Sequence, residues 1–213
     1  MDTGIQKACV DSLRVFSKEK YNVKLKATHA HELFAAYMGY KSKNGLLADK
    51  EYPMANFSHC KIIVMMSDDF INDRRKHLNE LPPELPDSYT LGEAVYGALF
   101  DDRWWSSSYP PFRSFEKMAL HLVKNYPAYQ AVFNPSLNPP THHVVEIENA
   151  SNHVFVTVTH ANKNSNGELI GCGQTTVNLP RVAGRIGFGA PQISVEQWTA
   201  GARRKLGVEG VQS

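Results

Sequence analysis

Hydrophobic residues recur at three- and four-residue steps through the first two-thirds of the chain, the spacing that places side chains on one face of a helix. This pattern predicts amphipathic helices over residues 4–20, 28–38, 90–99 and 114–123. Between them, the β-branched and apolar run 60–66 (CKIIVMM) predicts a buried strand. Thr90, with Glu93 three residues later, forms a capping-box pattern at the start of one of these helices.

The periodicity changes after residues 134–140 (NPSLNPP), which are rich in turn-forming residues. Beyond them, apolar and polar residues alternate over 144–147, 154–158 and 169–179, as expected for antiparallel strands with one buried face. Ser194 is a possible N-cap for a closing helix that carries Trp198. The sequence therefore predicts an α+β fold, with a mainly helical region over 1–138 and a small antiparallel β region with a C-terminal helix over 139–213.

The stretch 24–50 (KLKATHAHELFAAYMGYKSKNGLLADK) predicts two short helices joined by a glycine turn. Thr28 is the expected N-cap of the first helix, Gly39 can adopt positive φ at its end, and Ser42 can cap the second. A small residue followed four positions later by a turn glycine, here Ala35 and Gly39, is typical of a DNA-binding helix-turn-helix. Lys41, Lys43 and Asn44 would then contact phosphates or bases.

Two other interpretations of this helix-turn-helix-like unit remain open. It can be a helical hairpin that packs on the rest of the fold, or a surface for docking another protein. The second helix is short, and Gly45 weakens it by roughly 1 kcal/mol relative to alanine. Residues 42, 45 and 48 are also not the branched aliphatics that a DNA-binding unit would pack against its first helix.

These residues also carry a resemblance to known families. The run THAHELFAAYMGYKSKNGLLAD resembles a segment of glyoxalase-related bacterial proteins, although Lys43 stands where that pattern has tryptophan and no glyoxalase metal-ligand pattern is present. The same run resembles a group of uncharacterised proteins carried on bacterial plasmids and integrative elements. This second resemblance continues through FINDRRKHL, LPPELPDSYTLGEAVYGALF and WWSSSYPPFRSFEK. It covers about two-thirds of the chain, and it implies a mobile-element protein without implying a reaction.

An aromatic and proline-rich loop follows the helix predicted to end near residue 99. Trp104, Trp105 and Tyr109 are candidates for contact with a protein partner, because large rigid rings bury much area at a low cost in entropy. The alternative is that these rings cover the hydrophobic core.

Composition limits the possible functions. The 213 residues carry a net charge of only +2, which predicts no strong affinity of the whole molecule for polyanions. Residues 1–50 hold nine Lys and Arg against five Asp and Glu, a local excess of four positive charges. Cys9, Cys60 and Cys172 are odd in number and far apart, as in a protein of the reducing cytosol. No apolar run is long enough to span a bilayer, so we expect a cytoplasmic protein that does not associate with a membrane.

Motifs for catalysis, cofactors or metals do not emerge from residue spacing. The glycine-rich stretches lack the lysine of a P-loop and the spacing of a dinucleotide fold. The leading hypothesis is a non-enzymatic binding protein of a bacterial mobile element, acting on DNA or on a host protein in a regulatory or anti-defence role, without a cofactor. The alternative is a small hydrolase or transferase with its site at the junction of the two regions, drawn from His142, His143, Glu146 and Cys172.

Overall fold

The computed structural model describes residues 4–127, 142–163 and 169–197; at 142–143, 160–163, 169–172 and 197 it describes the backbone alone. The fold is α+β, and in the described residues six α-helices and one 3-10 helix accompany six strands whose pairings are all antiparallel. The chain divides into two compact units. Unit one comprises residues 1–114 and 181–190, and unit two comprises residues 115–180 and 191–213.

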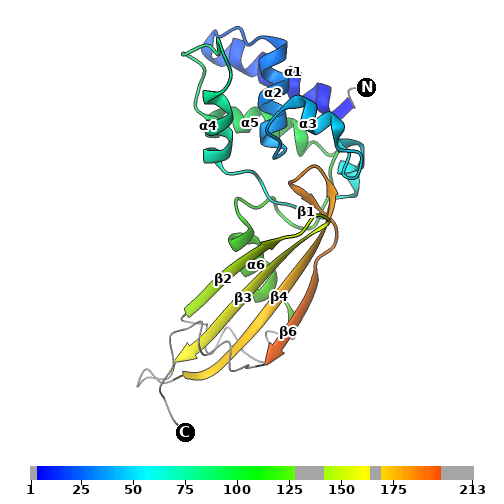
Figure 1. The fold of residues 1–213 in the computed structure, drawn as a ribbon, viewed down its shortest axis with the longest axis vertical. Coiled ribbons are helices and arrows are strands. Elements are labelled where there is room, and N and C mark those ends of the chain that lie inside the picture. The colour runs from blue at the N-terminus through cyan, green and yellow to red at the C-terminus, as the bar shows by residue number, and fades with distance from the viewer. Residues whose placement is uncertain (1–3, 128–141, 164–168, 198–213) are drawn as a thin grey trace. The chain divides into compact units, whose positions relative to one another are not determined.

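Unit one is mainly helical. It contains α1 (Gly4–Tyr21), α2 (Ala27–Tyr37), α3 (Lys43–Ala48), the 3-10 helix η1 (Met54–His59), β1 (Ile62–Ile63), α4 (Asp68–Lys76) and α5 (Ser88–Leu99). Within this unit α1 packs against α2 and α5, while α2 also contacts α3 and α4 (Figure 1). The helices predicted at 4–20 and 28–38 are confirmed with small shifts at their ends.

The core of unit one is centred on α2. The stripe predicted for that helix, Ala30, Leu33, Phe34, Tyr37 and Met38, is fully buried. Burial of such a stripe is the main stabilising contribution to a short helix, because isolated helices of this length are marginal in water. The periodicity of the sequence therefore identified the correct face of α2.

Two predicted helix caps are wrong. The helix α2 begins two residues earlier than expected, after Lys26 instead of Thr28, and no side chain caps it. The helix α5 begins at Ser88, where the Asp87 carboxylate accepts a hydrogen bond from the Thr90 N–H at 2.8 Å, so Thr90 is a helical residue and not the cap. Aspartate is as good an N-cap as threonine, and it comes earlier in the chain.

Residues 181–190 belong to unit one, and Ala183 and Ile186 lie in its core. The strand β5 (Gly187–Phe188) pairs with β1 and with the last residues of β4, and Ile186 and Phe188 are fully buried. The Gly184 N–H donates to the Tyr52 carbonyl at 2.8 Å. The glycines of this stretch allow close approach of backbones, here at Gly187, where an added Cβ would lie 2.4 Å from the Cys60 sulfur.

Unit two is a sheet with a helix on it. Its sheet has the strand order β2-β3-β4-β6. These strands are β2 (His142–Asn149), β3 (His153–Lys163), β4 (Leu169–Ala183) and β6 (Gln192–Gln197). Only the part of β4 up to Pro180 belongs to unit two. The helix α6 (Phe115–Lys124) lies along one face and contacts β3 (Figure 1). Val154, Val156 and Val158 of β3 are buried and alternate with partly exposed residues, as the sequence predicted.

The prediction of a helix capped by Ser194 is wrong over the described residues, since 192–197 form β6. The sequence QISVEQ alternates, and Gln192, Ser194 and Glu196 are exposed while Ile193 and Val195 are partly buried. Pairing with β4 provides the backbone hydrogen bonds that a helix would have provided internally. Residues 198–213, where the rest of that helix was expected, lie outside the described residues.

The expected boundary near residue 138 also lies outside the described residues. The two compact units divide after Ser114, and α6 of unit two contacts β3. No helix in the part of the chain that the structure describes is long and apolar enough to cross a membrane.

Candidate nucleic-acid interface

The turn between α2 and α3 has the local geometry that the sequence predicted. Gly39 has a φ of 88°, a left-handed conformation that favours glycine. The Gly39 and Tyr40 N–H groups donate to Ala36 and Ala35 carbonyls at 2.9 and 2.8 Å and end the helix. Ser42 caps α3, since its Oγ accepts from the Gly45 N–H at 3.0 Å. The two helices and the turn are therefore well defined, while α3 has only six residues.

Side chains of α3 divide into one anchor and a polar surface. Leu46 is buried and is the only buried residue of this helix. Lys41 and Asn44 are exposed and Lys43 is partly exposed. The three residues predicted to contact nucleic acid therefore lie around the start of α3, with side chains that solvent can reach.

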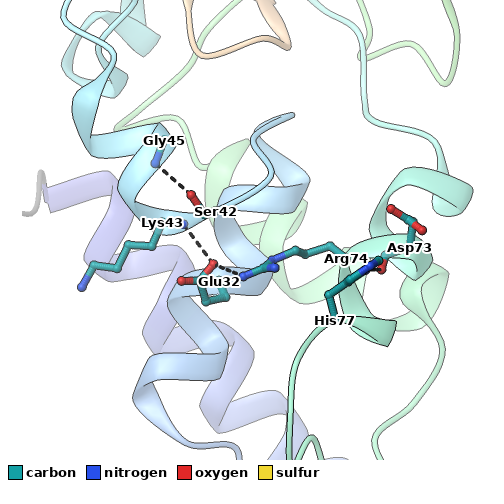
Figure 2. Close-up of polar contacts among 7 residues, drawn as sticks. All are labelled: Glu32, Ser42, Lys43, Gly45, Asp73, Arg74 and His77. Atoms are coloured by element: carbon teal, nitrogen blue, oxygen red, sulfur yellow. Dashed lines mark hydrogen bonds and ion pairs between the residues drawn. The ribbon is translucent and has the colours of Figure 1, made fainter.

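Glu32 of α2 fixes the start of α3 and also binds α4. Its Oε2 accepts a hydrogen bond from the Lys43 backbone N–H at 3.0 Å and forms an ion pair with Arg74 Nη2 at 2.7 Å. Figure 2 shows Glu32 between these two groups, with the Lys43 side chain directed away from it. One carboxylate therefore joins three helices, and its charge is balanced by Arg74, which leaves the Lys43 ammonium available to another anion.

We expect Glu32→Ala to lower the free energy of unfolding by roughly 1–3 kcal/mol, because it leaves the Lys43 N–H and the partly buried Arg74 guanidinium without their acceptor. Urea denaturation measures this change. Glu32→Gln is the matched variant, since its amide oxygen can still accept from the Lys43 N–H but cannot form the ion pair. A stability equal to wild type for Glu32→Ala would show that neither contact holds α3 in place.

The end of α3 is held by a second carboxylate. The Asp49 side chain accepts from the Tyr40 hydroxyl at 2.6 Å and from the Tyr52 and Glu51 N–H groups at 2.9 and 3.1 Å. Desolvation alone would raise the pKa of Asp49, but these hydrogen bonds outweigh it and hold that pKa below its ordinary value of 3.8. The ionised form is therefore the one that the folded protein prefers.

Stability should consequently fall when Asp49 is protonated. A lowered pKa in the folded state contributes stability that is present above the unfolded pKa, near 3.8, and is lost as pH falls through the folded value. We expect Asp49→Asn to destabilise the protein at pH 7 by about 1 kcal/mol, a modest value because the carboxylate is largely solvated. The difference from wild type should shrink as thermal unfolding is repeated from pH 5 down to pH 2. A constant difference over that range would contradict the assignment.

Arg185 is a candidate site residue that the sequence did not reveal. Its backbone N–H donates to the Met38 carbonyl at 3.1 Å, and its guanidinium carbon lies 5.2 Å from the centre of the Tyr40 ring. The side chain is exposed. Arg185 thus adds a cation beside the turn that precedes Lys41, from a segment more than 140 residues away in the chain. No local pattern marks it, because the contact arises from the pairing of β5 with β1.

The last turn of α4 carries Arg74, Arg75 and Lys76, but the two arginines are engaged within the protein. Arg74 is paired with Glu32, and Arg75 donates to the Pro86 and Leu85 carbonyls at 2.5 and 3.2 Å. His77 Nδ1 lies 2.8 Å from the Asp73 carbonyl oxygen (Figure 2). Arg74 therefore joins α4 to α2, and Arg75 joins α4 to the segment that precedes α5. Lys76 and His77 are left exposed at this end of the helix.

The three aromatic residues proposed to bind a protein partner differ in exposure. Trp105 is 8% exposed, its Nε1 donates to the Cys60 carbonyl at 3.0 Å, and its ring lies 5.2 Å from that of Phe100, so it occupies the core. Trp104 is partly buried and packs against Gly4. Tyr109 is partly buried. Trp105 therefore covers the core, as the alternative interpretation of this loop predicted. Trp104 and Tyr109 keep some accessible surface.

The residues of the alternative catalytic hypothesis lie in unit two. The side chains of His142, His143 and Cys172 are outside the described residues, and Glu146 is exposed on β2 opposite Thr157. The backbone register aligns His142 with Ala161 of β3 and Ala161 with Cys172 of β4. Among the described residues, no group of three or more His, Cys, Asp or Glu side chains is arranged to hold a metal ion.

Comparisons with protein-family models, with curated proteins and with solved structures find no match for this chain.

Proposed function

We propose that this protein binds duplex DNA without catalysis, through the α2–turn–α3 unit. The observation that supports this proposal is the gathering of Lys41, Lys43, Asn44 and Arg185 around one turn. The Glu32 carboxylate, which binds the start of α3, is already neutralised by Arg74. Cations that can reach phosphate oxygens supply most of the affinity of a protein for DNA.

The length of α3 limits how the protein would read sequence. Six residues at about 1.5 Å each give a helix of roughly 9 Å, less than two turns. Such a helix can insert one or two side chains toward base edges, and Asn44 is the residue suited to this, since its amide can bond to adenine. We therefore propose binding dominated by phosphate contacts, with weak preference for base sequence.

The biological setting is proposed from the resemblance to plasmid and integrative-element proteins. A small DNA-binding protein of a mobile element would act in regulation or against host defence. A host protein is the second candidate partner, supported by Leu47 of α3, which is 37% exposed beside the same cations.

Fluorescence anisotropy of a labelled mixed-sequence duplex, measured across a salt series, tests this proposal. With three cations at the interface, we expect the logarithm of the binding constant to fall with the logarithm of salt concentration with a slope of about −3. Binding should change little between unrelated duplex sequences. Absence of binding at 20 to 50 mM salt, roughly the range where phosphate contacts are strongest, would reject the DNA proposal.

A further inference from the structure

Unit one contains a cleft that the proposed DNA interface does not use. It has a volume of about 210 Å³ and lies between the start of α4, one face of α5 and the chain at Arg113. Its lining includes Asp68, Tyr89, Glu93, Tyr96, Phe100 and Arg113. A cavity of roughly 150 Å³ accommodates a benzene ring, so this cleft has room for one small group.

Aromatic rings form the cleft's walls. The ring of Tyr96 stacks on Phe100 with centroids 5.6 Å apart and meets Tyr37 edge-on at the same distance. The Tyr96 hydroxyl oxygen accepts from the Met66 N–H at 3.2 Å, which fixes the ring. At Gly97, an added Cβ would meet nothing within 4 Å, so the absence of a side chain leaves space beside these rings. The rings of Tyr96 and Phe100 therefore pack together along one wall, and the space beside Gly97 is open.

Two carboxylates and one guanidinium set the charge of the cleft. Asp68 and Glu93 contribute two negative charges and Arg113 contributes one positive charge, a net charge of −1. The N-terminus of α4 would by itself favour an anion, but the first turn of that helix carries the carboxylates of Asp68 and Asp69. Burial, assisted by the Asp68 charge and opposed by the Met66 hydrogen bond, raises the pKa of Tyr96 and keeps its phenol neutral. The lining thus favours a cation.

The structure also gives an example of the group that this lining accepts. The guanidinium carbon of Arg113 lies 4.5 Å from the centre of the Tyr89 ring, within cation–π range. Tyr89 is 52% exposed, so this contact lies where solvent reaches the ring. Arg113 therefore behaves as an internal cation bound to Tyr89, and an external cation of similar chemistry would compete with it.

We propose that this cleft binds a small organic cation, a guanidinium or alkylammonium group with an apolar stem. The charged head would bond to Asp68 and Glu93, and the stem would pack on the rings of Tyr89, Tyr96 and Phe100. This chemistry occurs both in free amines and in the arginine or lysine side chains of a peptide.

The probes are butylguanidinium, butylammonium and the neutral isostere butylurea, titrated into the full chain and followed by calorimetry and by amide chemical shifts. We expect both cations to bind and to shift resonances of α4 and α5, with butylurea at least about tenfold weaker, because it lacks the charge. The tripeptide acetyl-Gly-Arg-Gly-amide distinguishes the two sources. Binding tighter than that of butylguanidinium indicates a peptide side chain, and weaker binding indicates a free cation.

Variants locate the site. Glu93→Gln and Asp68→Asn should each weaken butylguanidinium binding by roughly tenfold, whereas Asp69→Asn, a neighbouring exposed carboxylate that does not line the cleft, should not. Arg113→Gln should strengthen binding, because it removes the competing cation. Circular dichroism verifies that each variant is folded.

Three results would overturn the proposal: no binding of either cation, equal binding of butylurea, or loss of cation binding in Arg113→Gln. In the last case, a titration with methyl phosphate would determine whether the cleft accepts an anion through Arg113. These outcomes are independent of the DNA measurements, since no cleft residue is part of the proposed DNA interface.

Discussion

Reversing the charge of both Lys41 and Lys43 to glutamate should weaken duplex DNA binding by roughly a hundredfold or more at low salt. Each substitution removes one phosphate contact and places a carboxylate against a polyanion. The slope of the logarithm of the binding constant against the logarithm of salt concentration should change from about −3 to about −1, since two of the three proposed cationic contacts are lost. The measurement is the same anisotropy titration used for the wild type. Because both side chains are at least partly exposed, the variant should remain folded.

The matched control is Lys20→Glu with Lys61→Glu, two exposed lysines on other parts of unit one. This pair changes the net charge of the molecule by the same amount, so any general effect of charge appears equally in both variants. We expect Lys20→Glu/Lys61→Glu to bind much more tightly than Lys41→Glu/Lys43→Glu. Similar losses in the two double variants would place the interface elsewhere or indicate non-specific attraction.

Gly39→Val should destabilise the protein by roughly 2–4 kcal/mol. Gly39 has a φ of 88°, and a β-branched residue adopts this conformation only with strain. In addition, an added Cβ would lie 2.7 Å from the Arg185 Cβ and 3.2 Å from the Met66 sulfur. Since the nearest atom belongs to a Cβ and not to the end of a flexible side chain, relief requires movement of the backbone. Urea or thermal denaturation measures the loss.

Gly97→Ala is the control for this substitution. Gly97 lies inside α5, and its added Cβ meets nothing within 4 Å. Alanine should therefore stabilise the protein by about 0.5–1 kcal/mol through helix propensity. If Gly39→Val were as stable as wild type, the left-handed turn and its contact with Arg185 would not be features of the folded protein.

The same strain connects stability to the proposed interface. The Arg185 N–H is bonded to the Met38 carbonyl, one residue before Gly39. A valine at position 39 that displaces residues 184–186 would also move the Arg185 guanidinium away from Tyr40. Gly39→Val should therefore weaken DNA binding by displacing Arg185, even under conditions in which the protein is still folded.

Local pattern was sufficient for most helices and strands. The apolar stripe of α2, the left-handed Gly39, the Ser42 cap and the alternation of β3 depend on interactions within a few residues, so the sequence contains the relevant information. The caps of α2 and α5 were predicted wrongly because several residue types can fill the same role at neighbouring positions. The stretch at Ser194 was predicted wrongly because serine is a common helix N-cap, whereas the alternating sequence QISVEQ pairs as a strand with β4.

Residue pattern alone predicts an α+β chain, two short helices around Gly39, and Lys41, Lys43 and Asn44 as accessible polar residues at the start of the second helix. Only the tertiary structure placed Arg185 beside Tyr40, paired Glu32 with Arg74, moved Trp105 into the core and assembled the cleft between α4 and α5. The first three of these contacts join residues that lie from about 40 to more than 140 positions apart in the chain. No spacing rule records such contacts, because helix and strand periods describe neighbours along the chain, whereas long-range contacts depend on how whole elements pack.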